Sequence, residues 1–295
     1  MSYYIDRKTG KKVKEKVAGN QFIVWTYNTS VGKGLLELIV KRKFFSSLYG
    51  KLQDSSHSKK KIGDFVRDFN IHMGEAERED ILEYTSFNDF FTRRLKSESR
   101  KIDRSENALI SPADGKILAY ENIHVDKIIQ VKGFFYKLKD LFNDKNEAEL
   151  YEGGTCIVVR LAPNDYHRFH FVDDGIPRDV KRIKGDYYSV NPIALREVIS
   201  LYCRNKRHIT MFDSKNFGQV AFVDVGATCV GSIIQTFNEY KEVKKGDEKG
   251  YFKFGGSTVI MFLQKGMVNM DLDIVGNSKD GIETSVFMGE KIGEK

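Results

Sequence analysis

Near the C-terminus the sequence reads Phe254-Gly255-Gly256-Ser257-Thr258, and the apolar run Val259-Ile260-Met261-Phe262-Leu263 follows directly. Two adjacent glycines favour a turn, and a short uninterrupted apolar run favours a buried strand. The pattern therefore predicts a turn that leads into a core strand, with Ser257 at the junction.

The position of Ser257 limits its chemistry. A serine hydrolase usually carries its nucleophile in a Gly-x-Ser-x-Gly elbow, whereas here the residue two after the serine is Val259. A second chemistry is attack of the Ser257 hydroxyl on the carbonyl of Gly256, where no Cβ obstructs the approach. The resulting ester would eliminate, cut the chain and leave dehydroalanine, which hydrolyses to a pyruvoyl group.

Two upstream motifs supply the other parts of an acyl-transfer site. They read Ser111-Pro112-Ala113-Asp114-Gly115 and Tyr166-His167-Arg168-Phe169-His170. A carboxylate and imidazoles are the groups that activate a serine hydroxyl. From the residues alone, Asp114 also suits a plain turn, and the His-x-x-His pair also suggests a metal. The metal is disfavoured because no cysteine or His-Glu partner stands at a usual ligand spacing.

Together these motifs resemble the phosphatidylserine decarboxylases, a family of self-cleaving, pyruvoyl-dependent enzymes of phospholipid synthesis. The resemblance runs from about Trp25 to about Phe262. The family usually has leucine at the position of Gly255 and valine at that of Ala113, but the Gly256-Ser257 bond is retained. The matching segments, in order, are Phe87-Asn88-Asp89-Phe90-Phe91-Thr92-Arg93-Arg94, Ser111 to Gly115, Val131-Lys132-Gly133, Asp165 to His170, Val190-Asn191-Pro192, Val225-Gly226-Ala227-Thr228 and Gly250 to Thr258.

The resemblance implies a role for each site residue. His170 removes the proton of Ser257, while Asp114 orients the His170 imidazole and stabilises it when charged. His167 acts in the second reaction, where it manages the proton that replaces carbon dioxide. Cleavage between Gly256 and Ser257 gives a large chain 1–256 and a small chain 257–295.

The resemblance also implies the activity and its cofactor. Phosphatidylserine is decarboxylated to phosphatidylethanolamine and CO2 through an imine with the pyruvoyl group made from Ser257. That covalent group replaces pyridoxal phosphate, and no metal is expected. The expected partners are phosphatidylserine in an anionic membrane and the two cleaved chains as a heterodimer, with a homo-oligomer as a further family-based expectation.

Charge and composition narrow the partners and the location. The chain has 295 residues and a formal net charge of +7, which favours acidic partners. Nucleic acid is disfavoured because the sequence has no zinc spacing, no ribonucleoprotein-type aromatic motif and no long basic tail. Three widely spaced cysteines and the lack of a signal-like stretch favour the cytoplasm. No apolar run approaches the ~18 residues of a spanning helix, so the expected place is peripheral, on the cytoplasmic side of the cell membrane.

The predicted fold class is α+β, with an N-terminal helical region packed on a mostly antiparallel β core. Residues 1–107 form the helical, membrane-proximal region, and residues 108–295 form the β-rich catalytic domain. Apolar residues from Ile62 to Phe69 recur on one helix face. Ser86 is typical of an N-cap and opens a short helix that turns inward Phe87, Phe90, Phe91 and Leu95.

Beyond residue 108, short β-rich runs are separated by Gly, Asp and Asn. Polar composition predicts surface loops at Asp140 to Glu149 and at Asn238 to Gly250. The apolar segment from Gly34 to Gly50, interrupted by basic residues, is either buried or laid into a lipid interface. The predicted strands are Lys116 to Tyr120, Thr155 to Leu161, His208 to Phe212, Gln219 to Val225, Thr228 to Gln235 and Thr258 to Leu263.

Two other function classes remain open from the sequence. A serine hydrolase would keep Ser257 as a persistent nucleophile in one intact chain that reacts with fluorophosphonates. A non-catalytic peripheral lipid-binding module would be an intact chain that binds anionic vesicles and has no reactive centre. The integrity of the chain separates the decarboxylase from both.

Overall fold

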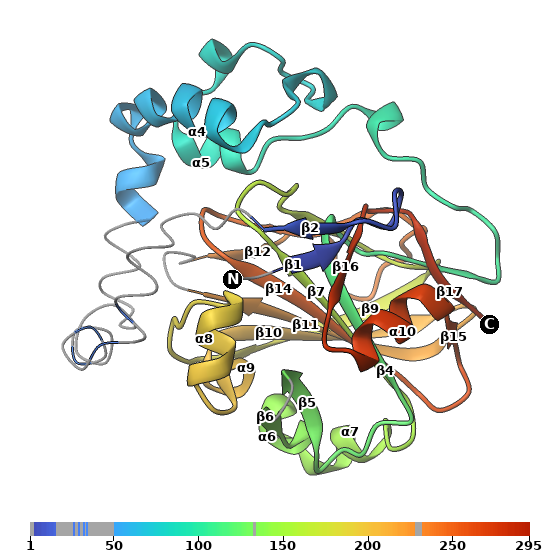
Figure 1. The fold of residues 1–295 in the computed structure, drawn as a ribbon. Coiled ribbons are helices and arrows are strands. Elements are labelled where there is room, and N and C mark those ends of the chain that lie inside the picture. The colour runs from blue at the N-terminus through green and yellow to red at the C-terminus, as the bar shows by residue number, and fades with distance from the viewer. Residues whose placement is uncertain are drawn as a thin grey trace.

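The computed structural model describes residues 3–15, 50–131, 134–227 and 232–295, and also the isolated positions Thr26, Thr29, Gly32 and Gly34. Strands β1 and β2 lie within residues 3–14, helical turns occupy residues 50–99, and strands dominate after residue 107 (Figure 1). The predicted α+β class is confirmed. The apolar segment from Gly34 to Gly50, predicted to be either buried or laid into a lipid interface, lies outside the described residues except at its ends.

A large sheet of nine strands forms the centre of the molecule, in the order β2-β1-β16-β4-β7-β14-β11-β10-β9. Its neighbours pair antiparallel, except that β1 and β16 are parallel. The strands are β1 (Tyr3–Ile5), β2 (Lys12–Lys14), β4 (Gly115–Glu121), β7 (Thr155–Leu161), β9 (Gly175–Ile183), β10 (Arg207–Ser214), β11 (Gly218–Gly226), β14 (Ser257–Leu263) and β16 (Glu283–Val286).

Smaller sheets flank the large one. One of them pairs β8 and β12 with β13, and another pairs β3 and β15 with β17. The sheet that contains β8 matters for the site, because β8 carries His170. The strands are β3 (Ala108–Ile110), β5 (Ile128–Val131), β6 (Phe134–Tyr136), β8 (Arg168–His170), β12 (Ile233–Gln235), β13 (Glu248–Phe252), β15 (Asn269–Met270) and β17 (Lys291–Glu294).

The central strand β14 is buried on both faces, and its side chains alternate between two core layers. Ile260 and Phe262 pack into the layer covered by α6 (Leu138–Phe142), α8 (Pro192–Glu197) and α9 (Leu201–Arg204), which lie below the sheet in Figure 1. Val259 and Met261 pack into the opposite layer. Ser257 lies two residues before Val259 in the same strand, so its side chain points to the same face of the sheet as that of Val259.

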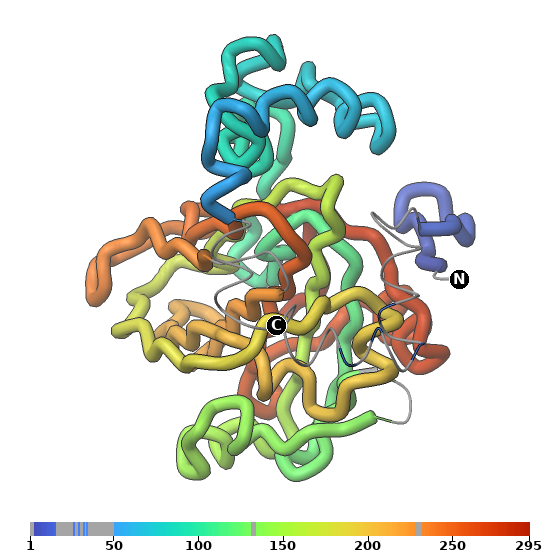
Figure 2. Tube along the Cα trace, turned by 90° about the vertical axis from the view of Figure 1, so that its left-hand side faces the viewer, coloured from blue at the N-terminus to red at the C-terminus, as the bar shows by residue number. Residues whose placement is uncertain are grey.

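The N-terminal helical turns form a lobe with a small aromatic core of its own. Figures 1 and 2 show this lobe, residues 50–91, above one end of the large sheet. The chain then returns to the sheet through an extended segment. The lobe contains η2 (Ser56–Lys61), α4 (Ile62–Phe69), η3 (Met73–Glu75), η4 (Ile81–Glu83) and α5 (Phe87–Phe91), and η5 (Ser97–Ser99) follows it. Its buried core residues are Ile62, Tyr84, Phe87, Phe90 and Phe91.

Both helices predicted in this lobe are confirmed. α4 spans Ile62–Phe69, and Asn70 ends it in the left-handed conformation. The Ser86 hydroxyl caps α5 by accepting a hydrogen bond from the Asp89 backbone N–H at 3.1 Å. Leu95 lies beyond this helix in an isolated bridge with Ala76.

Most of the predicted strands are confirmed, at the positions of β4, β7, β10, β11 and β14. The run predicted from Thr228 to Gln235 is a strand only at Ile233–Gln235, and residues 228–231 lie outside the described part. The loop predicted from Asn238 to Gly250 is irregular through residue 247 and then becomes β13.

The loop predicted from Asp140 to Glu149 is wrong, because α6 and α7 (Lys145–Glu149) occupy it. The Asp144 carboxylate caps α7 by accepting from the Glu147 N–H at 3.1 Å. Leu141, Phe142 and Ala148 are buried between these short helices and the sheet. Their burial stabilises the two helices. The charged residues on the outer faces of these helices led to the loop prediction.

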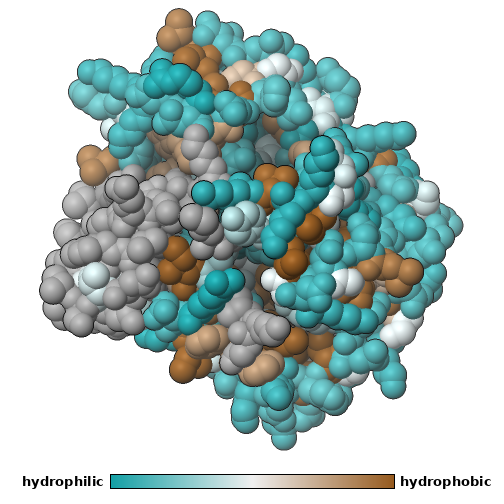
Figure 3. Space-filling model, viewed as in Figure 1, coloured by the Kyte–Doolittle hydropathy of each residue, from teal (hydrophilic) through white to brown (hydrophobic). Residues whose placement is uncertain are grey.

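In the parts of the chain that the structure describes, no helix has both the length and the apolar character needed to cross a bilayer. Figure 3 shows a mostly hydrophilic face with small separate hydrophobic patches.

Candidate active site

Ser257 is the first residue of β14, at the edge of the double-sided core. It pairs with Gly226 of β11 and with Leu161 of β7, and it is fully buried. Its Oγ lies 3.4 Å from Nδ1 of His167, a long hydrogen-bond distance. The predicted junction between turn and strand is confirmed, and the hydroxyl faces an imidazole.

His167 lies between β7 and β8, fully buried and stacked on Phe91 with ring centroids 4.0 Å apart. Its Nε2 is 3.1 Å from the carbonyl oxygen of Ala162. A carbonyl only accepts, so Nε2 carries the hydrogen and the lone pair of Nδ1 faces Ser257. Burial lowers the pKa of His167 to about 3, against the opposing charge of Asp165. His167 is therefore a neutral imidazole that accepts from the serine hydroxyl.

His170 ends β8 and has a different environment. Its Nδ1 lies 2.9 Å from the carbonyl oxygen of Gly246, so Nδ1 donates and Nε2 is left as an acceptor. Nε2 is buried and has no hydrogen-bond partner among the described residues. Burial lowers the pKa of His170, while the carbonyl of Gly246 and the charges of Glu248 and Asp114 raise it. His170 thus offers an unused lone pair next to acidic groups.

Asp114 lies at the turn into β4 and is held by an arginine. Arg100 donates to its carboxylate from Nε at 2.9 Å and from Nη2 at 2.5 Å, and the Met288 N–H donates at 2.8 Å. The same arginine pairs with Glu75 of the helical lobe at 3.0 Å. These bonds occupy the Asp114 carboxylate, and its charge raises the pKa of His170 without a direct hydrogen bond.

The predicted constellation is therefore assembled only in part. The structure brings His167 to Ser257, and it brings Arg100 to Asp114. Among the described residues, no hydrogen bond joins Asp114 to His170 or His170 to Ser257. The roles inferred from the resemblance stay predictions, and Arg100 is a site residue that the sequence pattern did not single out.

The segment before Ser257 is fixed from the helical lobe. Gly255 has φ of +140°, a conformation that favours glycine, and a Cβ on Gly256 would lie 3.2 Å from Val190. The N–H of Phe254 donates to Oδ1 of Asn88 at 2.8 Å. The tract is thus anchored two residues before the Gly256–Ser257 bond.

A fully buried ion pair lies on the same face of the sheet as Ser257. Nζ of Lys249 donates to Oδ2 of Asp224 at 2.6 Å and to Oε1 of Gln235 at 3.0 Å. Asp224 stands opposite Val259 in the β11–β14 register, and both charged residues are 0% exposed. Burial lowers the pKa of Lys249, while the charge of Asp224 raises it. Removing one partner would leave the other charge buried and unpaired.

We expect Lys249→Met to lower the free energy of unfolding by about 3–5 kcal/mol, because an uncompensated carboxylate remains in the core. Denaturant unfolding in a Ser257→Ala background measures this on an uncut chain. The double variant Lys249→Met/Asp224→Leu is the control and should recover most of the loss. A single variant within about 1 kcal/mol of its parent would contradict the prediction.

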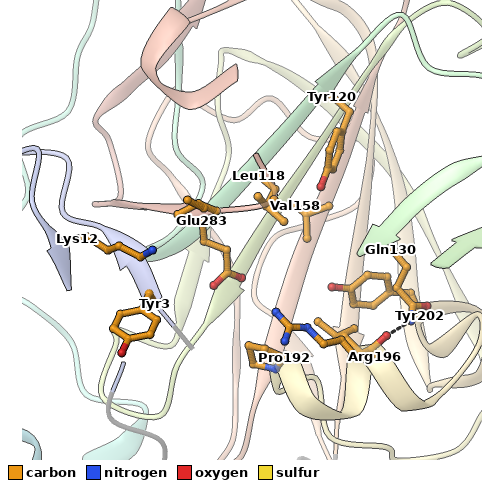
Figure 4. Close-up of a pocket in the computed structure, with 13 residues that line it drawn as sticks. Tyr3, Lys12, Leu118, Tyr120, Gln130, Val158, Pro192, Arg196, Tyr202 and Glu283 are labelled. Atoms are coloured by element: carbon orange, nitrogen blue, oxygen red, sulfur yellow. Dashed lines mark hydrogen bonds between the residues drawn. The ribbon is translucent and has the colours of Figure 1, made fainter. Parts of the chain in front are cut away.

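A separate cavity of about 390 Å³ lies on the opposite face of the sheet (Figure 4). Leu118 and Val158 form its apolar floor, and Tyr120 and Tyr202 border it. The Gln130 amide at its side donates to the Leu195 carbonyl at 2.8 Å. Both floor residues belong to the layer away from Ser257, so this cavity is distinct from the serine site.

The surroundings of Ser257 fit a pyruvoyl group made in place. The side chain is fully buried, faces a neutral imidazole and follows two glycines. In the described ranges, no three His, Cys, Asp or Glu side chains are grouped so that they could hold a metal ion. Because residue 257 is fully buried, an electrophile formed there would be shielded from bulk water.

Comparison with known proteins places the chain among relatives of one kind. A family model described as phosphatidylserine decarboxylase matches residues 87–294. A protein of Clostridium perfringens is 54% identical over 290 residues, covering 98% of each chain. One of Clostridium botulinum strain Alaska E43 is 56% identical with the same coverage, and one of Clostridium novyi is 56% identical over 281 residues, 95% of each chain. All three carry the name phosphatidylserine decarboxylase proenzyme.

Proposed function

The chain belongs to the phosphatidylserine decarboxylase family, and from this membership we propose that it cuts itself before Ser257 and converts phosphatidylserine to phosphatidylethanolamine and CO2. The observation that carries the proposal is the placement of the Gly256–Ser257 bond. That bond lies between an anchored Gly-Gly turn and a core strand, and its hydroxyl faces a neutral imidazole.

Self-cleavage would use only groups of this chain and one water. The Ser257 Oγ attacks the carbonyl carbon of Gly256, and its proton passes through a base to the Ser257 nitrogen as the C–N bond breaks and the ester forms. A base then removes the Ser257 α-proton, the Cβ–Oγ bond breaks, and a Gly256 carboxylate and dehydroalanine remain. Hydration of that residue leaves a pyruvoyl group and releases ammonia, which takes the proton from the base and leaves as ammonium.

We assign the proton of Ser257 to His170 and the later proton transfer to His167. His167 accepts the serine hydrogen bond, but burial opposes its protonation, since its pKa is about 3. Burial lowers the pKa of His170 as well, but its Nε2 is free and the charge of Asp114 favours an imidazolium. No direct bond joins His170 to Ser257, so transfer needs a bridging water or a rotation of the side chain.

In the decarboxylation the pyruvoyl carbonyl supplies an electrophile for the substrate amine and a sink for the electrons released with CO2. The chain's own residues would position this chemistry. Strands β7 and β11 hold residue 257 between them and exclude water. Nδ1 of His167 stays beside that residue and is the nearest imidazole nitrogen for a proton at the substrate α-carbon.

We further propose that the helical lobe faces the membrane, on the cytoplasmic side. Leu52 and Leu82 of this lobe are 55% and 69% exposed and offer apolar side chains to a lipid interface. The net charge of +7 favours an anionic lipid surface. A heterodimer of the two cleaved chains belongs to this proposal, and a homo-oligomer stays a family-based expectation.

The intact mass of the purified protein under denaturing conditions tests the proposal. We expect two species, residues 1–256 and residues 257–295, the smaller with a blocked N-terminus. The same protein should release CO2 from vesicles that contain phosphatidylserine. One uncut chain without this activity would overturn the proposal and favour the hydrolase or the lipid-binding module.

A further inference from the structure

We propose that Asn88 is a positioning residue for self-cleavage, and that Asp54 holds it in place. Both residues lie in the helical lobe, outside the sheet that carries the scissile bond. The inference rests on the proposed cleavage before Ser257 and adds to it a dependence on the docked lobe. Cleavage then proceeds at full rate only after the lobe has folded against the catalytic domain.

The amide of Asn88 links two chain segments. Its Oδ1 accepts the N–H of Phe254 at 2.8 Å, and its Nδ2 donates to Oδ1 of Asp54 at 2.9 Å. Nζ of Lys253 donates to both oxygens of Asp54 at 3.1 Å. Asn88 is 3% exposed, so water does not replace these bonds readily. The amide orientation is therefore set by an acceptor on one side and a donor on the other.

Aromatic packing fixes the same point of the chain. The Phe254 ring meets Phe87 at 4.9 Å and Phe91 at 5.0 Å between centroids, both edge-on. Phe91 also stacks on His167, which in turn contacts Ser257. One short helix, α5, thus touches both the segment before the scissile bond and the imidazole beside its hydroxyl.

This anchor matters because the two residues after it are glycines. Gly255 and Gly256 have no Cβ and sample many backbone conformations unless both ends are fixed. Ser257 is fixed by strand pairing at one end, and Asn88 fixes Phe254 at the other. Attack requires the Ser257 Oγ to approach the Gly256 carbonyl carbon closely, and a small misplacement of reacting atoms is costly.

The role predicts a specific pattern of loss and rescue. Asn88→Ala removes the acceptor for Phe254, and we expect cleavage to slow by about 10-fold or more. Asn88→Asp keeps an acceptor but places a carboxylate against Asp54, so it should also slow cleavage. Asp54→Asn added to Asn88→Asp restores a donor and an acceptor in swapped positions. That double variant should cleave within about 3-fold of the parent rate, as a bond pattern rather than a residue type is restored.

Cleavage can be timed in a cell-free synthesis reaction by following labelled full-length chain as it converts to fragments. Ile81→Ala serves as a matched control, because Ile81 packs in the lobe core without touching Phe254 in any described contact. Melting temperatures of all variants in a Ser257→Ala background show how far each one destabilises the uncut chain.

The expected result is slow cleavage of Asn88→Ala compared with an Ile81→Ala chain of equal melting temperature, with rescue by the swapped pair. Unchanged cleavage of Asn88→Ala would overturn the inference. So would a swapped pair as slow as Asn88→Asp alone. Failure of the parent chain to cleave would instead overturn the proposed function, so the two failures are distinguishable.

Discussion

Replacing Ser257 by alanine is expected to leave one uncut chain of 295 residues and to abolish decarboxylation. Alanine has no oxygen to attack the Gly256 carbonyl, and it cannot become a pyruvoyl group. Both the cut and the electrophile are therefore lost together, while the small side chain fits the same buried position. Denaturing mass spectrometry and CO2 release from phosphatidylserine vesicles measure the two losses.

Thr258→Val is the matched control, because it removes a hydroxyl from the next residue. The Thr258 Oγ1 is buried with no hydrogen-bond partner among the described residues, so its loss should cost little stability. This variant should still be cut. Cleavage of the Ser257→Ala chain would refute the serine mechanism. An uncut parent that reacts with a fluorophosphonate at Ser257 would identify a hydrolase instead.

The second large effect is expected from replacing the two histidines, because each replacement should block a different one of the two reactions, self-cleavage or decarboxylation. We expect His170→Ala to remain uncut, because the base for the Ser257 hydroxyl is lost. His167→Ala should be cut but release little CO2, because the imidazole beside residue 257 is lost. Burial lowers the pKa of both histidines, so the two assignments rest on the free Nε2 of His170 near Asp114 and on the contact of His167 with residue 257.

Fragment patterns and CO2 release per cut chain distinguish the two variants. The opposite pattern, with His167→Ala uncut and His170→Ala cut, would assign the base to the imidazole that lies 3.4 Å from Ser257. His208→Ala is a control for the loss of another buried imidazole. Burial lowers the pKa of His208 to about 3 as well, but its described contact is with Gln235 at 3.4 Å.

The parts of the fold that the sequence predicts well are those determined by local sequence patterns. The helix face from Ile62 to Phe69, the Ser86 cap and the apolar run after Ser257 are each decided by neighbours within one turn or one strand. The loop prediction for Asp140 to Glu149 was wrong because most residues there are polar. The helix cap at Asp144 and the few buried apolar side chains are weak signals against that background.

The site residues divide in the same way. The Gly-Gly-Ser junction is a local signal and lies where the sequence predicts it. The contacts of Arg100 with Asp114 and of Asn88 with Phe254 join segments far apart in the chain, and they depend on how the lobe docks. No periodicity or spacing in the sequence reports such contacts.

The position of β14 has a consequence for the lifetime of the enzyme. Once the bond before Ser257 is cut, a separate chain supplies β14 between β7 and β11 and β16 between β1 and β4. The sheet would have formed while both segments belonged to one polypeptide. After denaturation, the two separate chains would have to meet by diffusion, and the small chain would have to insert its strands into the middle of the sheet. Refolding would then fall behind aggregation, and survival would depend on how slowly the mature form unfolds. The uncut precursor would fold into this sheet, whereas the cut protein would retain the sheet but would not form it again after unfolding.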